Sequence, residues 1–310
     1  MLTIPYLETE IVNHCNLACM ECSHHSPYMK HGGYPIDEFT RDVNQLSRVM
    51  RVKKFRLLGG EPLLVENLID YITALRQSGL AENIGICTNG ILLRKVDKKI
   101  LDQLDILEVS FYPVDPPIRE VIENNIARLM EFDRNKIKVY PINQFRLTSQ
   151  VFENPDKALV KNIWDDCWVK EKTNAVYRGY FFKCLTSQRK GQFLKQMNGS
   201  CDPRLLKPET DGVSIYADDF PVNLIKYLAS ATPLVACNFC MGTSGKLIDH
   251  VQNHHNQITI KDLEELRVSL TINPNPRFSS KLKIWVVRSW GKVKHLMKQV
   301  QRQGRLVLRF

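Results

Sequence analysis

The feature that most limits the possible folds is a repeated alternation of strand and helix patterns in the first half of the chain. Short runs rich in apolar and β-branched residues alternate with segments whose apolar residues recur at helical spacing. The expected strands span 6–13, 53–58, 84–87, 106–111 and 136–142, and the expected helices span 36–50, 64–78, 97–104 and 116–132. Such alternation predicts a parallel sheet with right-handed crossovers, either open or closed into a barrel, and therefore the α/β class.

Chemically distinctive residues follow each of the first four expected strands. A cysteine-rich loop follows the first, and the others end in Gly59-Gly60-Glu61, Thr88-Asn89-Gly90 and Phe111-Tyr112-Pro113. In β/α folds the chemistry lies where the parallel strands end. We therefore expect these four segments to meet on one face of the sheet.

The composition is that of an ordinary globular protein, since 44% of the 310 residues are hydrophobic and 25% are charged. This balance excludes a disordered or fibrous chain. There are 43 Lys and Arg against 33 Asp and Glu, and residues 276–310 hold ten of the basic and none of the acidic residues. The positive charge thus belongs to the end of the chain. No run approaches the roughly 18–20 apolar residues of a membrane span, and the first residues do not resemble a secretory signal.

Cys15, Cys19 and Cys22 form the pattern Cys-x3-Cys-x2-Cys. Clustered cysteines in a chain expected in a reducing cytoplasm are more often metal ligands than disulfides. Most iron–sulfur sites use four cysteines, so three thiolates leave one iron of a cubane cluster open to a small molecule. The alternative is a zinc site whose fourth ligand is His14, His24 or His25.

These three cysteines after a first strand, followed by Gly59-Gly60-Glu61-Pro62 after a second, resemble the radical S-adenosylmethionine (SAM) superfamily. The resemblance implies a partial (β/α)6 TIM-like barrel and a [4Fe–4S] cluster whose open iron chelates SAM. One electron, from an external donor such as flavodoxin or ferredoxin, then cleaves SAM to methionine and a 5′-deoxyadenosyl radical. That radical removes a hydrogen atom from the substrate, so the protein's task is to orient the cofactor.

The resemblance also implies which residues bind SAM. Gly59 and Gly60 would let the backbone approach the methionine amino group, where a Cβ would clash, and Glu61 follows in the same turn. Asn89 and Ser110, at the ends of the third and fourth strands, are candidates for the ribose hydroxyls, with plain turn chemistry as the alternative. Glu21 stands where the family usually has an aromatic residue, at a position used largely through backbone contact with adenine.

A second set of cysteines follows in the pattern Cys167-x11-Gly179-x4-Cys184, then Cys237-x2-Cys240. This set resembles the SPASM/twitch extensions of radical SAM enzymes, and because no cysteine follows Cys240 it resembles the twitch type with one auxiliary [4Fe–4S] cluster, similar to aminocyclitol dehydrogenase-type twitch enzymes. The alternative is a structural zinc site with the same four ligands. Cys201 is left over and is interpreted as a spare buried thiol or a substitute ligand.

The strand–helix alternation stops near residue 150, so three parts are expected: a barrel over 1–150, an irregular, twitch-like auxiliary domain over 151–270 and a basic helical tail over 271–310. Residues 281–303 carry an apolar stripe among basic residues. Packing on the barrel or a subunit contact is favoured for this tail, then an anionic membrane surface at the inner membrane, then nucleic acid.

Three residues are candidates for catalysis. His24 follows the third cysteine and is suited to hydrogen bonding or proton transfer, with a loop histidine of no function as the alternative. Glu10 shares one strand face with Glu8, which matters only if that face points into the barrel. Cys87 ends the third strand, where a thiol either gives a hydrogen atom to a substrate radical or belongs to the core. His250, His254 and His255 are spaced for a helix face and favour a solvated helix over a metal site.

A nearby auxiliary cluster can accept the second electron of a two-electron oxidation. The sequence therefore favours a radical SAM oxidoreductase acting on a sugar-like or aminocyclitol substrate. The alternatives are a peptide-modifying maturase, an epimerase with Cys87 as hydrogen donor and, as a non-enzyme, an iron–sulfur sensor that binds nucleic acid.

Overall fold

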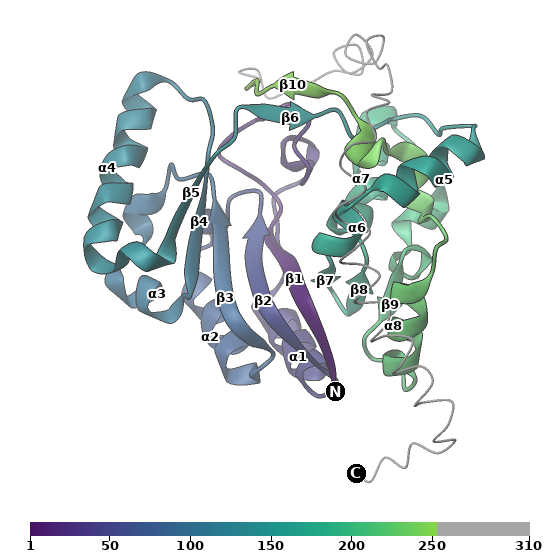
Figure 1. Cartoon of the computed structure of the whole chain (residues 1–310), viewed down its shortest axis with the longest axis horizontal. Coiled ribbons are helices and arrows are strands. Elements are labelled where there is room, and N and C mark those ends of the chain that lie inside the picture. The colour runs from purple at the N-terminus through teal and green to yellow at the C-terminus, as the bar shows by residue number, and fades with distance from the viewer. Residues whose placement is uncertain (253–310) are drawn as a thin grey trace. The chain divides into compact units, whose positions relative to one another are not determined.

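The computed structural model describes residues 1–252, and all of them belong to one compact unit (Figure 1). The basic tail expected over 271–310, and with it His254 and His255, lies outside the described residues. Within the described part, no helix combines the length and the apolar character that crossing a bilayer requires.

The unit is built on an eight-stranded sheet with the order β5-β4-β3-β2-β1-β7-β8-β9. Its first five strands are mutually parallel and follow one another in space as they do in sequence. They are β1 (Leu2–Val12), β2 (Met50–Gly59), β3 (Ala81–Thr88), β4 (Ile106–Phe111) and β5 (Ile137–Pro141). The helices that connect them are α1 (Ile36–Ser47), α2 (Leu68–Ser78), α3 (Lys98–Gln103) and α4 (Pro116–Asp133). The α/β class with a parallel sheet is therefore confirmed.

Local sequence accounts for where these helices begin and end. Phe39, Val43 and Leu46 form the buried face of α1 at helical spacing, and α1 is shorter than expected because Met50 already begins β2. Helix α2 ends at Gly79, whose φ of 63° lies in the left-handed region that favours glycine.

The core lies between the sheet and its helices. Strands β1 and β2 run in register from Leu2 opposite Met50 to Glu10 opposite Leu58. The inward side chains of both strands are completely buried, among them Leu7, Phe55 and Leu57. This packing fixes the carboxyl ends of β1 and β2 side by side, which is what positions the functional residues described below.

The second half of the described chain is more regular than the sequence suggested. Instead of an irregular region it contains α5 (Lys157–Asp166), α6 (Val169–Lys172), β7 (Ala175–Tyr177), β8 (Tyr180–Phe182), α7 (Lys190–Asn198), β9 (Gly212–Ser214) and α8 (Phe220–Ala229). The strands have three residues each, too few for a periodic pattern to be seen in the sequence.

None of the described strands that follow β5 in the sequence pairs with β5, which stays at the edge of the sheet. Strand β6 (Gln144–Arg146) leaves the sheet and pairs antiparallel with β10 (Leu247–Asp249), as Figure 1 shows above the sheet. The sixth parallel strand is β7, which joins the opposite edge through Glu8 and Ala175. Strands β8 and β9 continue from it antiparallel. The sheet thus runs across the boundary expected near residue 150.

Candidate functional site

A cavity of about 370 Å³ opens at the carboxyl ends of β1 to β4, under the β6–β10 pair. Its size lies within the range of about 300–1,000 Å³ typical of small-molecule sites. The four segments expected to converge all contribute to its lining. Of the predicted site residues, the ones that line it are Cys15, Cys19, Glu21, Cys22, His24, Gly59, Gly60, Cys87, Asn89 and Ser110. Their convergence, predicted from the parallel strand order, is confirmed.

The three cysteines of the first loop present their sulfur atoms to nitrogen donors. Leu17 N lies 3.4 Å from Cys15 Sγ, and Asn89 Nδ2 lies 3.5 Å from the same atom. His250 Nε2 and Gln252 Nε2 lie 3.2 and 3.1 Å from Cys19 Sγ. Hydrogen bonds to sulfur are among the means by which proteins adjust iron–sulfur clusters. This donor set fits thiolates that bind a cluster.

Burial makes these thiols poor acids in the absence of a metal. It raises the pKa of Cys15 and of Cys19 to about 12, and it also raises the pKa of Cys22. A metal must therefore displace the protons, since only the thiolate is a ligand. Among residues 1–252, no three His, Cys, Asp or Glu side chains are placed to hold a single metal ion. The assignment of these cysteines to a cluster thus depends on their number, their spacing and their common cavity.

Glu21 adopts an unusual backbone conformation within this loop, with φ at 56°. Its Oε2 accepts hydrogen bonds from Thr148 N at 3.1 Å and from Ser149 N at 3.3 Å. The side chain thereby ties the cysteine loop to the segment that follows β6. Glu21 lines the cavity, and its carboxylate is engaged by the protein, so the adenine contact expected from its backbone stays a prediction.

Gly59, the last residue of β2, and Gly60 after it lie so close to other backbone that neither position has room for a Cβ. A Cβ on Gly60 would lie 2.0 Å from the carbonyl oxygen of His14, and one on Gly59 would lie 2.2 Å from that of Val12. Glu61 N also donates to His14 O at 3.1 Å. The clash of a Cβ with the methionine amino group of SAM, expected from the sequence, stays a prediction. In the structure the clash is with the backbone of the cysteine loop, which packs directly on this turn.

Glu61 does not line the cavity, unlike the other predicted SAM-binding residues. It is completely buried, and its carboxylate accepts hydrogen bonds from Leu63 N at 3.0 Å, Thr88 Oγ1 at 2.7 Å and Asn89 N at 2.8 Å. Burial raises its pKa to about 7, although these three donors oppose the rise. Glu61 therefore links the ends of β2 and β3 and holds Asn89 in place. The Asn89 side chain also donates to Asn16 Oδ1 at 2.7 Å.

The two glutamates of β1 both point into the protein. Glu10 Oε1 lies 2.6 Å from His24 Nδ1, and its Oε2 accepts from Gln188 Nε2 at 2.8 Å and pairs with Arg189. Burial disfavours the Glu10 carboxylate, but the charge of Arg189 and the contact with His24 outweigh it and lower the pKa. Glu8 instead pairs with Arg56 on β2. Of the two, Glu10 is the one whose carboxylate directly contacts His24 of the cavity wall.

Cys87 lies on the cavity wall with its Sγ 3.6 Å from Ser110 Oγ. Burial raises its pKa to about 11, so the sulfur carries its hydrogen at neutral pH. The position leaves both interpretations of Cys87 open, as a hydrogen donor or as part of the wall.

The four cysteines of the second set come together from three separate segments. Cys167 follows α5, Cys184 follows β8, and Cys237 and Cys240 belong to the turn that contains the short helix Val235–Phe239. Burial raises the pKa of Cys184 to about 12, and the nearby Cys167 and Cys240 add to the rise. Burial likewise raises the pKa of Cys237, and the nearby Cys240 and Cys184 add to the rise. Each of the four residues that the sequence singled out therefore lies within electrostatic range of at least one other of the set.

Close packing at Gly242 supports this arrangement. Gly242 has a φ of 52°, and a Cβ there would lie 3.1 Å from Cys167 Sγ. Its backbone N–H donates to Cys240 Sγ at 3.2 Å. A thiolate would accept this bond more strongly than a thiol, so the turn fits coordinated sulfur. Cys201 instead packs with the apolar group around Phe193.

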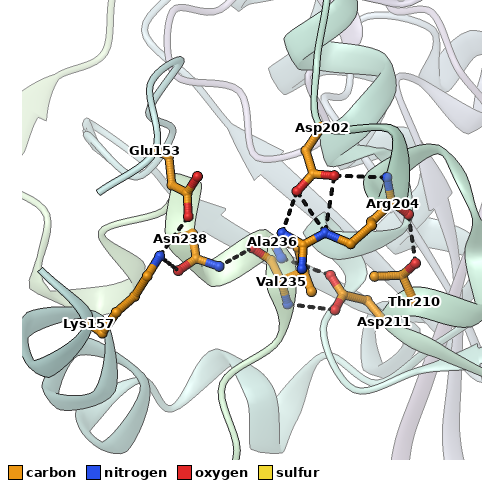
Figure 2. Close-up of polar contacts among 9 residues, drawn as sticks. All are labelled: Glu153, Lys157, Asp202, Arg204, Thr210, Asp211, Val235, Ala236 and Asn238. Atoms are coloured by element: carbon orange, nitrogen blue, oxygen red, sulfur yellow. Dashed lines mark hydrogen bonds and ion pairs between the residues drawn. The ribbon is translucent and has the colours of Figure 1, made fainter. Parts of the chain in front are cut away.

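Polar contacts, the innermost of them buried, hold the turn that carries Cys237 and Cys240 (Figure 2). The Asp211 carboxylate accepts from Val235 N at 2.7 Å and from Ala236 N at 2.8 Å, and Asn238 Oδ1 accepts from Lys157 Nζ at 3.0 Å. Figure 2 shows Asp211 facing the start of the turn from the segment before β9. The turn is therefore fixed from two sides, at its first amides and at Asn238.

Two residues at or next to the cavity, Arg146 and His250, were not assigned to it from the sequence. Tyr112 and Arg146 line the cavity, and His250 stacks on Tyr112 with ring centroids 4.9 Å apart. His250 is not on the helix that its spacing suggested, because it directly follows β10, and its backbone N–H donates to Asn143 O. Only the pairing of β6 with β10 brings it here, and that pairing joins residues about a hundred positions apart.

Comparison with known proteins identifies the first half of the chain. Residues 9–131 match the model of the Radical SAM superfamily. The GTP 3′,8-cyclase of Staphylococcus haemolyticus (strain JCSC1435) is 33% identical over 125 residues, which are 38% of this chain and 37% of that protein. A probable GTP 3′,8-cyclase of Methanocaldococcus jannaschii (strain ATCC 43067 / DSM 2661 / JAL-1 / JCM 10045 / NBRC 100440) is 30% identical over 160 residues, 48% of this chain and 52% of that protein.

The chain thus spans between about a third and a half of the length of the curated relatives it matches. Among solved structures, BtrN in complex with AdoMet and 2-DOIA is similar to 78% of this chain and to 94% of its own, with 17% identity and a TM-score of 0.43. The cofactors of the matching family are a [4Fe–4S] cluster and SAM. The cysteine loop and the glycine turn, which both line the cavity, lie within residues 9–131, the part of this chain that matches the Radical SAM superfamily.

Proposed function

We propose that this chain is a radical SAM oxidoreductase that oxidises or remodels a hydroxylated carbon of a sugar-like or aminocyclitol substrate. In this proposal residues 1–150 bind SAM and its cluster, and residues 151–270 hold an auxiliary [4Fe–4S] cluster that accepts an electron. The observation that carries the proposal is the second set of four cysteines, each within electrostatic range of another of the set, since a closed cluster requires four ligands.

The segment after β6 supports the proposal by joining the two cysteine sites. Ser149 forms a backbone bridge with Cys240, and Met241 N donates to Thr148 O at 2.8 Å. On their other side the amides of Thr148 and Ser149 donate to Glu21 in the first cysteine loop. The two sites therefore share one stretch of backbone, and an electron released at the cavity would have a short route to the second site.

Once bound, the first cluster and SAM supply the radical that removes a hydrogen atom. Gly59, Gly60, Asn89, Ser110 and Glu21 are proposed to bind SAM, while Cys15, Cys19 and Cys22 hold the cluster. His24, kept in place by Glu10, is proposed to hold the substrate hydroxyl by a hydrogen bond at the cavity wall. Net oxidation of a carbinol then removes one hydrogen atom, which leaves with deoxyadenosine, one electron, which passes to the auxiliary cluster, and one proton, which goes to solvent.

The metal content can be measured before any substrate is known. Anaerobically reconstituted protein should hold about eight irons, two [4Fe–4S] clusters, and Cys184→Ala should retain about half. Cys201→Ala is the matched control and should retain the full number, since Cys201 packs in the apolar group around Phe193 and belongs to neither cysteine pattern. Zinc instead of iron at the second set would refute the auxiliary cluster.

The substrate class is then tested with deuterated compounds. Sugars, aminocyclitols, nucleotide sugars and GTP are offered with SAM and a reductant, and deuterium in 5′-deoxyadenosine is measured. Transfer from a polyol or aminocyclitol supports the proposal. Transfer from GTP alone, the substrate in the name of the relatives, or from none of the panel would contradict it. A Cys87→Ala variant that accumulates oxidised product would favour an epimerase, and unchanged turnover would remove that alternative.

A further inference from the structure

Helix α7 begins with a lysine that is buried between the two cysteine sites. Lys190 is only 1% exposed, which is rare for a lysine because its ammonium ion is strongly hydrated. Its Nζ lies 3.4 Å from Ser149 Oγ and 5.2 Å from the centre of the Phe193 ring. A neutral hydroxyl and an aromatic face offset only part of the cost of burying a charge.

Ser149, which Lys190 Nζ contacts, forms a backbone bridge with Cys240 of the second cysteine set. Burial lowers the pKa of Lys190, and Cys240, Glu21, Cys184 and Cys237 oppose this, in that order. Three of the four cysteines therefore lie within electrostatic range of one buried ammonium. Neutral thiols would not stabilise the Lys190 ammonium electrostatically. Four thiolates around a [4Fe–4S] core would, because they carry net negative charge. The surroundings of Lys190 thus fit a loaded metal site better than four protonated thiols.

We propose that Lys190 is a positioning residue that supplies the buried counter-charge of the second cysteine site and raises the reduction potential of the cluster bound there. The inference depends on the auxiliary cluster of the proposed function. Net charge near a cluster is one of the factors that set its potential. A fixed positive charge stabilises the reduced state, which carries one more electron, and would favour electron transfer from the cavity.

Three variants of the full-length chain separate charge from shape. Lys190→Met removes the charge and keeps an unbranched apolar side chain, while Lys190→Arg keeps the charge. Lys195→Met is the matched control, because Lys195 lies on the exposed face of the same helix. Each is made in a Cys15→Ala background, in which the auxiliary cluster is to be followed without the signal of the first.

The measurement is a redox titration of the reconstituted protein, followed by electron paramagnetic resonance of the reduced cluster. At a fixed potential the ratio of reduced to oxidised cluster should fall about tenfold in Lys190→Met, equivalent to a shift of 59 mV. Lys190→Arg and Lys195→Met should stay within about threefold of the parent. An unchanged ratio in Lys190→Met, with the cluster present, would overturn the inference and leave the proposed function intact.

Iron counting covers the case in which the neutral variant does not assemble. Loss of iron in Lys190→Met but not in Lys190→Arg supports a counter-charge, because arginine keeps the positive charge of lysine and methionine does not. Loss in both overturns the inference, since the requirement would then be the shape of lysine. If the Cys15→Ala parent itself holds no auxiliary iron, the proposed function fails, and the experiment records that separately.

Discussion

Replacing Asp211 with alanine should loosen the turn that carries Cys237 and Cys240. The Asp211 carboxylate is buried and accepts hydrogen bonds from two successive amides, Val235 N and Ala236 N. Alanine leaves both amides without an acceptor at the start of the turn (Figure 2). Asparagine keeps one oxygen but turns an NH2 group toward the other amide, so its effect should be intermediate.

Two orphaned buried amides cost about 1–3 kcal/mol each. Burial raises the pKa of Asp211, which shows that desolvation offsets part of the stabilisation that the carboxylate provides. The lower part of the range therefore applies, about 2–3 kcal/mol for Asp211→Ala. For a domain of this size, a loss of about 2 kcal/mol lowers the midpoint of thermal unfolding by roughly 4–8 °C.

Calorimetry and iron analysis of reconstituted protein test this prediction together. The stability should fall in the order wild type, Asp211→Asn, Asp211→Ala, and the iron content of the second site should fall with it. Asp202→Asn is the control, because the Asp202–Arg204 pair is largely exposed on the arginine side and exposed ion pairs contribute little to stability. If Asp211→Ala and Asp202→Asn unfold at the same temperature and hold the same iron, the argument from buried amides is wrong.

Two further substitutions test the barrel. Arg56→Met removes the ion-pair partner of the buried Glu8, and the free energy of unfolding of the metal-free protein, measured in urea, should fall by about 3–5 kcal/mol. Arg119→Met, in an exposed helix pair, should lower it by less than about 1 kcal/mol. Equal losses would contradict the prediction. Gly60→Ala places a Cβ 2.0 Å from a carbonyl oxygen of the cysteine loop and should lower the affinity for SAM, measured by equilibrium dialysis, at least tenfold. Gly79→Ala is the control, because a Cβ there meets nothing within 4 Å, and it should bind SAM as the wild type does. Wild-type affinity in Gly60→Ala would refute the close packing.

The sequence was sufficient for the barrel strands and for most of the cavity because both follow local rules. Parallel strands end on one edge of the sheet, so Asn89 and Ser110 had to approach the cysteine loop once their strands were recognised. A clash at Gly60 was expected, but the sequence does not show that the His14 backbone is one of the neighbours a Cβ would meet. Glu61 was placed in the right turn, yet its burial depends on Thr88 and Asn89 of the next strand.

Contacts between distant segments were not predictable in the same way. Lys190 looks like an ordinary helix lysine, and nothing local indicates that Cys240 and Glu21 lie beside it. Gln252 reaches Cys19 only because β10 pairs with β6, two strands of three residues without a pattern of their own. Such contacts come from tertiary packing, which overrides local preference.

The hydrogen bonds from His250 and Gln252 to Cys19 have a consequence for biosynthesis. These donors follow the cysteine by 231 and 233 residues. At a synthesis rate of about 5–20 residues per second, the ribosome needs roughly 12–45 s to reach them. For all that time the nascent loop has its thiols but not the segment that covers them. Iron inserted earlier would stand open to oxygen, so the delivery machinery should act on the released chain rather than on the growing one.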